Sequence, residues 1–228
     1  MNNPFRERNG CILALVLVLL LIPVMASYGS EKEADRTRPP VRMAVIPFQA
    51  VPTNAQSGNS AICPLCGAVY FGGSVAEGGE KVVEELLLEN LRNLKEIELI
   101  PQEKVEGIYK RISSESLKIP VLEIVKKTGL ELDAGIIAVG YVFRYMERIG
   151  YDYSAEKPAS VAFEINFVNP KDGSIIWRGV FDKTQKSLME DVFQIASFYK
   201  GHGKWLTARE LTKQGMNEAF KTFSGFEH

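Results

Sequence analysis

Histidine, cysteine and tryptophan are scarce in this chain of 228 residues, which contains two, three and two of them. The histidines, His202 and His228, are too far apart in sequence to indicate a catalytic pair, and they lack the paired spacing of metal ligands. The sequence also lacks a nucleophile elbow and a glycine-rich nucleotide fingerprint. No signature of a hydrolase or a nucleotide-binding enzyme is therefore present.

An excess of charge of either sign is absent as well. The chain has 27 basic and 28 acidic side chains, a formal net charge of -1. Nucleic-acid binding draws on clustered lysine and arginine, so no nucleic-acid partner is expected. The composition, 46% hydrophobic and 24% charged, is that of a folded domain rather than a disordered chain or a collagen-like repeat. No internal repeat or low-complexity tract occurs.

Long hydrophobic runs are limited to one, near the N-terminus. Arg6 and Arg8 precede the apolar run 11–23, and small or modest residues up to Ala26 follow it. A basic start, a short apolar run and a small-residue exit are the three parts of a secretory signal peptide. The run is shorter than the roughly 20 residues that a membrane-spanning helix needs. We predict a signal peptide over residues 1–26; an uncleaved inner-membrane anchor is the alternative.

The predicted cleavage places the mature protein in the periplasm or outer envelope. Cys11 lies at the front of the apolar run, whereas a lipoprotein signal has its cysteine directly after the run, so a lipid-modified start is not expected. Residues 27–40 are charged, end in two prolines and contain few large apolar groups, which is typical of a solvated tether. The remainder, 41–228, is predicted to be one α/β domain.

Hydrophobic periodicity within this domain alternates between the period of strands and that of helices. The apolar runs predict strands over 41–48, 97–100, 134–145, 161–167 and 174–181. Amphipathic patterns predict helices over 77–94, 102–112, 121–128 and 185–199, and a last helix that begins at a capping box formed by Thr207 and Glu210. This order predicts a single α/β domain with a mixed β-sheet flanked by helices, plus a C-terminal helical pair.

Three local features refine this prediction. Asp172 and Gly173 suit the backbone angles of a hairpin turn between the last two strands. Gly129 is placed to cap the helix before it. Strand 161–167 alternates large apolar residues with Ala162, Glu164 and Asn166, so one buried face and one wetter face are expected. Residues 49–73 have no periodicity and are predicted to form a long loop.

Cys63 and Cys66 form the one motif in that loop with a specific chemical meaning. Exported proteins fold in an oxidising compartment, so we predict a disulfide that adds roughly 2 kcal/mol at most. A thioredoxin-type redox site is an alternative, but it needs a helix that begins at its first cysteine, and glycines follow here. A zinc site is another, but only two of its four ligands are visible, so no metal and no cofactor are predicted. Gly67 replaces the histidine of a haem-attachment motif.

A cluster of aromatic and charged residues follows the strand predicted over 134–145. Tyrosine and arginine are favoured at interface hot spots, so the cluster is a candidate interaction patch. A sheet edge covered by amphipathic side chains is the alternative interpretation. The candidate residues are Tyr141, Arg144, Tyr145, Arg148, Tyr151 and Tyr153.

Three stretches of the sequence resemble a known group of proteins. They are 45–48 (VIPF), 136–142 (IIAVGYV) and 168–177 (VNPKDGSIIW). The pattern resembles small α/β domains of bacterial envelope proteins: the TolB N-terminal domain, the curli-secretion protein CsgG and the lipoprotein activators of peptidoglycan synthases. The resemblance implies a binding role and carries over no catalytic residue. Many of those proteins are lipid-anchored, whereas this sequence lacks the cysteine for an anchor.

These observations lead to one functional hypothesis and one alternative. The hypothesis is an exported, non-enzymatic binding or adaptor module whose partner is an envelope protein or a peptidoglycan-associated component. Peripheral association with a membrane is compatible with it, and the oligomeric state is open. The alternative is a periplasmic thiol–disulfide or metal-dependent enzyme that uses Cys63 and Cys66.

Overall fold

The computed structural model describes residues 39–53, 59–115, 118–152, 154–185 and 205–226. Three predicted segments lie wholly or almost wholly outside these residues and stay predictions: the signal peptide, the tether except residues 39–40, and the helix 185–199 except its first residue.

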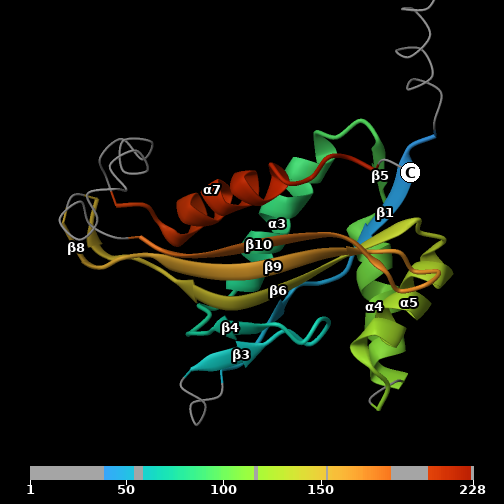
Figure 1. Ribbon diagram of the computed structural model, residues 1–228, viewed down its shortest axis with the longest axis horizontal. Helices are drawn as coiled ribbons and strands as arrows, with labels where there is room; N and C mark the ends of the chain where they lie inside the picture. The colour runs from blue at the N-terminus through green and yellow to red at the C-terminus, as the bar shows by residue number, and fades with distance from the viewer. Residues whose placement is uncertain (1–38, 54–58, 116–117, 153, 186–204, 227–228) are drawn as a thin grey trace, which may run out of the picture. The chain divides into compact units, whose positions relative to one another are not determined.

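The central element is a mixed six-stranded sheet (Figure 1). Five strands run in the order β10-β9-β6-β1-β5, and the short strand β2 pairs with β6 beyond the end of β1. β1 is parallel to β5 and β6, whereas β9 is antiparallel to β6 and β10. The strand bounds are β1 Val41–Val45, β2 Gln49–Ala50, β5 Ile97–Leu99, β6 Ile136–Met146, β9 Ser160–Val168 and β10 Ile175–Thr184. The predicted mixed α/β fold is confirmed.

Helices cover both faces of this sheet. On one face lie α3 (Gly79–Arg92) and α7 (Ala208–Phe220), and on the other lie α4 (Gln102–Glu115) and α5 (Val121–Leu132) (Figure 1). Each face has its own buried apolar cluster, because β6 and β9 send large side chains to both sides. Of the predicted C-terminal helical pair, α7 is the member within the described residues. Its capping box, formed by Thr207 and Glu210, is confirmed.

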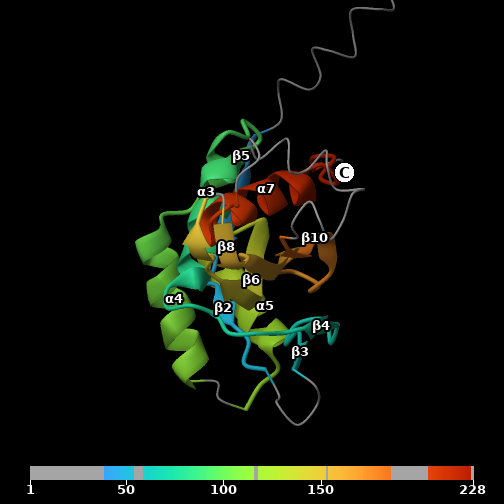
Figure 2. The same cartoon turned by 90° about the vertical axis from the view of Figure 1, so that its left-hand side faces the viewer.

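The loop predicted over 49–73 contains a two-stranded hairpin, so this part of the prediction is wrong. Strands β3 (Ser60–Ile62) and β4 (Val69–Phe71) pair antiparallel, with Ala61 opposite Tyr70. Each strand has three residues, too few for periodicity to reveal. The hairpin lies on the same face of the sheet as α5, and α7 lies on the opposite face (Figure 2). A second small hairpin, β7 (Ile149–Tyr151) with β8 (Ser154–Lys157), was also not predicted.

The end of α5 differs from the prediction as well. The helix continues through Gly129 to Leu132, and Asp133 adopts the left-handed conformation that caps it. Gly129 serves packing instead, because a Cβ atom there would lie 2.4 Å from Pro170 Cβ. The turn after β9 agrees with the prediction: Gly173 has a φ of 80° and donates its N–H to the carbonyl of Asn169 at 2.8 Å.

Two glycines test this packing in opposite directions. A Cβ atom on Gly140 of β6 would lie 2.2 Å from the Phe48 ring, so Gly140→Ala is expected to cost roughly 1–3 kcal/mol of unfolding free energy. Gly107 lies exposed within α4 with open space around it, so Gly107→Ala is expected to add about 0.5–1 kcal/mol. Urea unfolding measures both. Equal effects of the two substitutions would contradict the described packing of Phe48 on β6.

Candidate functional site

Hairpin β3–β4 covers the face of β9 that was expected from the sequence to be exposed to solvent. All nine residues of β9 are buried, including Glu164 and Asn166. From the hairpin, Ala61 and Cys63 are buried against the sheet. The Tyr70 ring stacks on Phe143 of β6 with ring centroids 4.0 Å apart. The polar side chains of β9 therefore lie inside the protein, beneath the cysteine motif.

The end of the hairpin is a tight turn that holds the two cysteines. Gly67 N–H donates to the Cys63 carbonyl at 3.0 Å, and Cys63 N–H donates to the Ala68 carbonyl at 2.8 Å. Gly67 has a φ of 73°, a conformation that favours glycine. Cys63 is buried, Cys66 is exposed, and both are free thiols in this structure. The disulfide predicted between them therefore stays a prediction.

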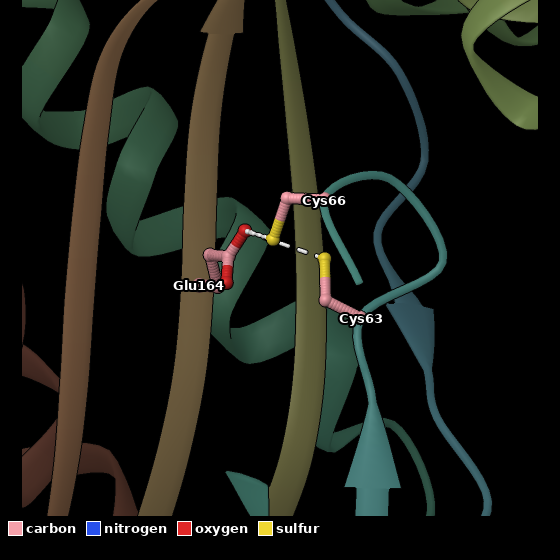
Figure 3. A group of neighbouring side chains, drawn as sticks. All are labelled: Cys63, Cys66 and Glu164. Carbon is pink, nitrogen blue, oxygen red and sulfur yellow. Dashed lines mark hydrogen bonds between the residues drawn. The ribbon is translucent and has the colours of Figure 1, made fainter. Parts of the chain in front are cut away.

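Both thiols point at the carboxylate of Glu164 (Figure 3). The Sγ atoms of Cys63 and Cys66 donate to Glu164 Oε1 at 3.3 and 3.2 Å. Asn166, two residues along β9, donates its Nδ2 to the same oxygen at 2.7 Å. Cysteines from the hairpin and a carboxylate nearly 100 residues later thus form one cluster.

The other oxygen of Glu164 is held by two further donors. Arg178 of β10 donates to Oε2 at 2.9 Å, and the Tyr70 hydroxyl donates to the same atom. Arg178 also donates to the Tyr70 hydroxyl at 2.7 Å. These bonds fix the orientation of the carboxylate, so that Oε1 faces the two sulfur atoms.

The protonation of the cluster follows from these contacts. Burial alone would raise the pKa of Glu164, but the hydrogen bonds that it accepts, above all from Arg178 and Tyr70, outweigh burial and lower the pKa to about 2. Burial raises the pKa of Cys63 to about 12, with a contribution from the negative charge of Glu164. Burial and the hydrogen bond to Glu164 likewise raise the pKa of Tyr70. At neutral pH the cluster consists of an ionised carboxylate, a neutral Cys63 thiol and a neutral phenol.

Asn166 leaves one polar atom of the cluster unsatisfied. Its Oδ1 is the one buried side-chain nitrogen or oxygen without a hydrogen-bond partner among the residues that the structure describes. Buried acceptors without a partner are rare in native proteins and call for an explanation.

This arrangement is a poor one for thioredoxin-type chemistry. A redox-active cysteine needs a lowered pKa, usually supplied by the N-terminus of a helix. Here the motif forms a hairpin turn, and the pKa of Cys63 is raised. What the cluster does offer is three ligand atoms, two sulfurs and one carboxylate oxygen, that lie within 4.8 Å of one another.

The predicted interaction patch is corrected in part. Tyr141, Arg144 and Tyr145 lie on β6 and are buried, so they are unavailable as surface contacts in this structure. Arg144 instead joins elements internally, donating to the Phe71 carbonyl at 2.6 Å and to Asp182 at 2.5 Å.

The rest of the predicted patch lies beyond the end of β6. Arg148 is half-buried and pairs with Asp152 at 2.6 Å, whereas Tyr151 is largely exposed. Tyr153 lies outside the described residues. The structure therefore does not bring the five described residues of the patch together on one surface.

Several members of the Glu164 cluster were not predicted from the sequence. Glu164 and Asn166 were expected to face water, and Tyr70 and Arg178 were not singled out. One usable signal was present: a carboxylate in the middle of a largely apolar strand needs a partner if the strand is covered.

No protein-family model matches this sequence, and no curated protein matches it. Among solved structures, the PelC dodecamer from Paraburkholderia phytofirmans is 8% identical with a TM-score of 0.45, covering 82% of this chain and 90% of that one. The hypothetical protein CT253 from Chlamydia trachomatis is 12% identical with a TM-score of 0.43, covering 82% and 97%. The LpoB C-terminal domain from Salmonella enterica is 12% identical with a TM-score of 0.36, covering 67% and 89%. Similarities this distant assign no family. Within the described segments, no helix has both the length and the apolar character needed to cross a membrane.

Proposed function

We propose that this protein is an exported, non-enzymatic binding module of the bacterial cell envelope, and that the outer face of hairpin β3–β4 binds a partner protein. The observation that carries the proposal is the exposure of three large apolar side chains on that face. Ile62, Val69 and Phe71 are 60%, 68% and 64% exposed. We call these three residues the hairpin apolar face.

The hairpin apolar face is continuous. Ile62 and Val69 are directly paired across the two strands, and Phe71 follows Val69 by two residues on the same side of β4. The inner side chains of the hairpin fasten it to the sheet, and the guanidinium of Arg144 lies 5.9 Å from the centre of the Phe71 ring. Apolar side chains clustered at the surface in this way mark interaction sites more often than isolated ones do.

The chemistry of the hairpin apolar face favours a protein over a glycan. Isoleucine, valine and phenylalanine side chains have no hydrogen-bonding groups, whereas a glycan presents hydroxyls that need partners. An apolar patch on a partner protein needs no hydrogen-bond partners, and its burial contributes about 25 cal/mol for each Å² removed from water.

Two other parts of the proposal have their own support. Export is supported by the N-terminal signal pattern. The raised pKa of Cys63 supports a role other than thiol–disulfide catalysis.

The test is photo-crosslinking in intact cells that express the full chain. With the crosslinking residue at position 69, we expect one discrete adduct with an envelope protein. Adding Phe71→Ser to the same chain should weaken binding of that identified protein roughly tenfold or more, since it removes about 1.5–3 kcal/mol of apolar contact. Because Phe71 is exposed, the free energy of unfolding of the variant should lie within about 0.5 kcal/mol of that of the parent chain.

The matched control places the crosslinker at Leu130, which is exposed on α5. The same adduct at Leu130, or no adduct at position 69, would refute this binding face. Adducts with lipid alone would mean that this face contacts a membrane, and adducts with a second copy of the chain would mean that it forms a self-interface. Either result would contradict the proposed partner protein. Fractionation of the same cells tests export separately: recovery of the chain with Met1 intact among soluble cytosolic proteins would contradict it.

A further inference from the structure

The two sulfur–oxygen distances within the Glu164 cluster are close to those of a tetrahedral zinc site. Zinc binds cysteine sulfur at about 2.3 Å and carboxylate oxygen at about 2.0–2.2 Å, so a sulfur and an oxygen on one tetrahedral ion lie about 3.5 Å apart. The corresponding distances from Glu164 Oε1 are 3.3 Å to Cys63 and 3.2 Å to Cys66. All three ligand atoms lie within 4.8 Å of one another.

The surroundings of these three ligands resemble the outer shell of a metal site. Two backbone hydrogen bonds, from Gly67 N–H to the Cys63 carbonyl and from Cys63 N–H to the Ala68 carbonyl, hold the turn that carries both sulfurs. Tyr70 and Arg178 hold Oε2 of the carboxylate and leave Oε1 to face the sulfurs. Outer-shell hydrogen bonds of this kind orient metal ligands. Cys66 is exposed, so an ion has a path from solvent.

Charge also favours a divalent cation. In the dithiol form, the negative charge of Glu164 is balanced by Arg178. When Zn²⁺ binds, the two S–H protons leave to solvent and two thiolates form. The charges of the ion, both thiolates, the carboxylate and the guanidinium then sum to zero. Exchange of two protons for one zinc ion therefore leaves no uncompensated charge in a buried site.

We propose that Cys63, Cys66 and Glu164 bind a zinc ion, with the fourth position taken by water. The ion fastens the end of hairpin β3–β4 to β9. A water molecule on the ion can donate to the otherwise unpartnered Oδ1 of Asn166. The site has three protein ligands rather than the four of a structural zinc finger.

The disulfide predicted from the sequence would use the same two sulfur atoms and exclude the ion. It would also remove both S–H donors from Glu164 Oε1, so a buried carboxylate would face two sulfur atoms that cannot donate. A bound zinc ion would instead place a cation beside Glu164 Oε1, where the two S–H donors were. The position of Glu164 beside the two sulfur atoms is therefore the reason to infer a metal rather than a disulfide.

The experiment uses the full chain, expressed for export and purified without chelator or reductant. Elemental analysis should find about one zinc per chain. After the zinc is removed, Co²⁺ added alone should produce the visible absorption of tetrahedral cobalt together with sulfur-to-cobalt charge-transfer bands, and added Zn²⁺ should abolish them. A disulfide between Cys63 and Cys66 with no bound metal would overturn the proposal, as would free thiols that bind no Co²⁺.

Three variants separate ligands from neighbours. Cys66→Ser and Glu164→Gln should each reduce zinc affinity by more than the roughly 10–100-fold effect of an outer-shell change, whereas Tyr70→Phe keeps all ligands and should stay near tenfold. Because Cys66 is exposed, its variant is expected to fold even if the Glu164 variant does not. Equal zinc affinity in the Cys66 variant and the parent chain would overturn the site. Neither result depends on whether the hairpin apolar face binds a partner.

Discussion

Replacing Glu164 by glutamine in the reduced, zinc-free protein is expected to lower the free energy of unfolding at neutral pH by about 3 kcal/mol. The pKa of Glu164 falls from the ordinary value of 4.5 to about 2 in the folded protein. Each unit of such a shift corresponds to about 1.36 kcal/mol of preference for the ionised form. The amide side chain of glutamine forfeits that preference, and it leaves Arg178, which is partly exposed, to be solvated by water. Urea unfolding at neutral pH measures the loss.

The same contribution has a defined pH dependence. Between about pH 2 and pH 4.5 the folded state binds fewer protons than the unfolded state, because the pKa of Glu164 is lower in the folded state. The stabilisation is therefore complete above about pH 5, declines as the pH falls and is absent below about pH 2. The parent chain should lose it over this window, and the Glu164→Gln variant should not. The difference in unfolding free energy between the two proteins should shrink from about 3 kcal/mol towards zero.

Glu156→Gln provides the matched control, since Glu156 is an exposed glutamate on β8. Its effect on the free energy of unfolding at neutral pH should remain within about 0.5 kcal/mol. A difference between the parent chain and the Glu164 variant that does not change with pH would mean that Glu164 is not held ionised by its neighbours. A Glu164 variant as stable as the parent would contradict the described cluster.

The features of this fold that local chemistry determines could be predicted from the sequence. The capping box of Thr207 and Glu210 and the turn at Gly173 use bonds between residues a few positions apart, and both occur as expected. The helical stripe of α3 is likewise local, and Val83, Leu87 and Leu91 are buried. The mixed sheet follows from the order of strands and helices.

The burial of Glu164 could not be predicted, because it depends on contacts that are distant in sequence. Alternation along β9 correctly indicates a strand, but it cannot tell a face covered by water from one covered by another segment. The hairpin that covers this face consists of two strands of three residues, in a stretch whose glycines and prolines are typical of loops. The cysteine motif could be recognised from the sequence, but only the fold shows that the Glu164 carboxylate faces the two cysteines.

The error at Gly129 has a similar origin. A glycine near the end of a helical pattern usually caps the helix. Here it lies within α5, where its missing side chain makes room for Pro170 of the β9–β10 turn. Tyr141 and Tyr145 show that residue type alone is also insufficient. Tyrosine is favoured at interfaces, but β6 places both side chains in the core.

The largest loss of stability is expected from Phe167→Ala. Phe167 is fully buried on β9, and its ring lies 4.6 Å from that of Trp177 and 5.5 Å from that of Phe223. Removal of a buried aromatic side chain costs roughly 3–5 kcal/mol, because it combines lost transfer free energy with an empty cavity. Phe223 follows α7 in the sequence and packs on Phe167, so the substitution should also loosen α7. Relative to the parent chain, backbone hydrogen exchange should therefore accelerate more in α7 than in β6.

Phe71→Ala is the matched control for this prediction, because it removes the same side chain from an exposed position. Phe71 is expected to contribute to binding and Phe167 to stability. The free energy of unfolding of Phe71→Ala should therefore stay within about 0.5 kcal/mol of that of the parent chain, while the affinity for the partner falls. Phe167→Ala should lower the free energy of unfolding but, for as long as it remains folded, should leave the affinity for the partner unchanged. Equal losses of stability in the two variants would mean either that Phe220, Phe223 and Phe226 are not packed on Phe167 of β9 or that the hairpin apolar face is part of the core. The second of these outcomes would remove the surface on which the proposed function depends.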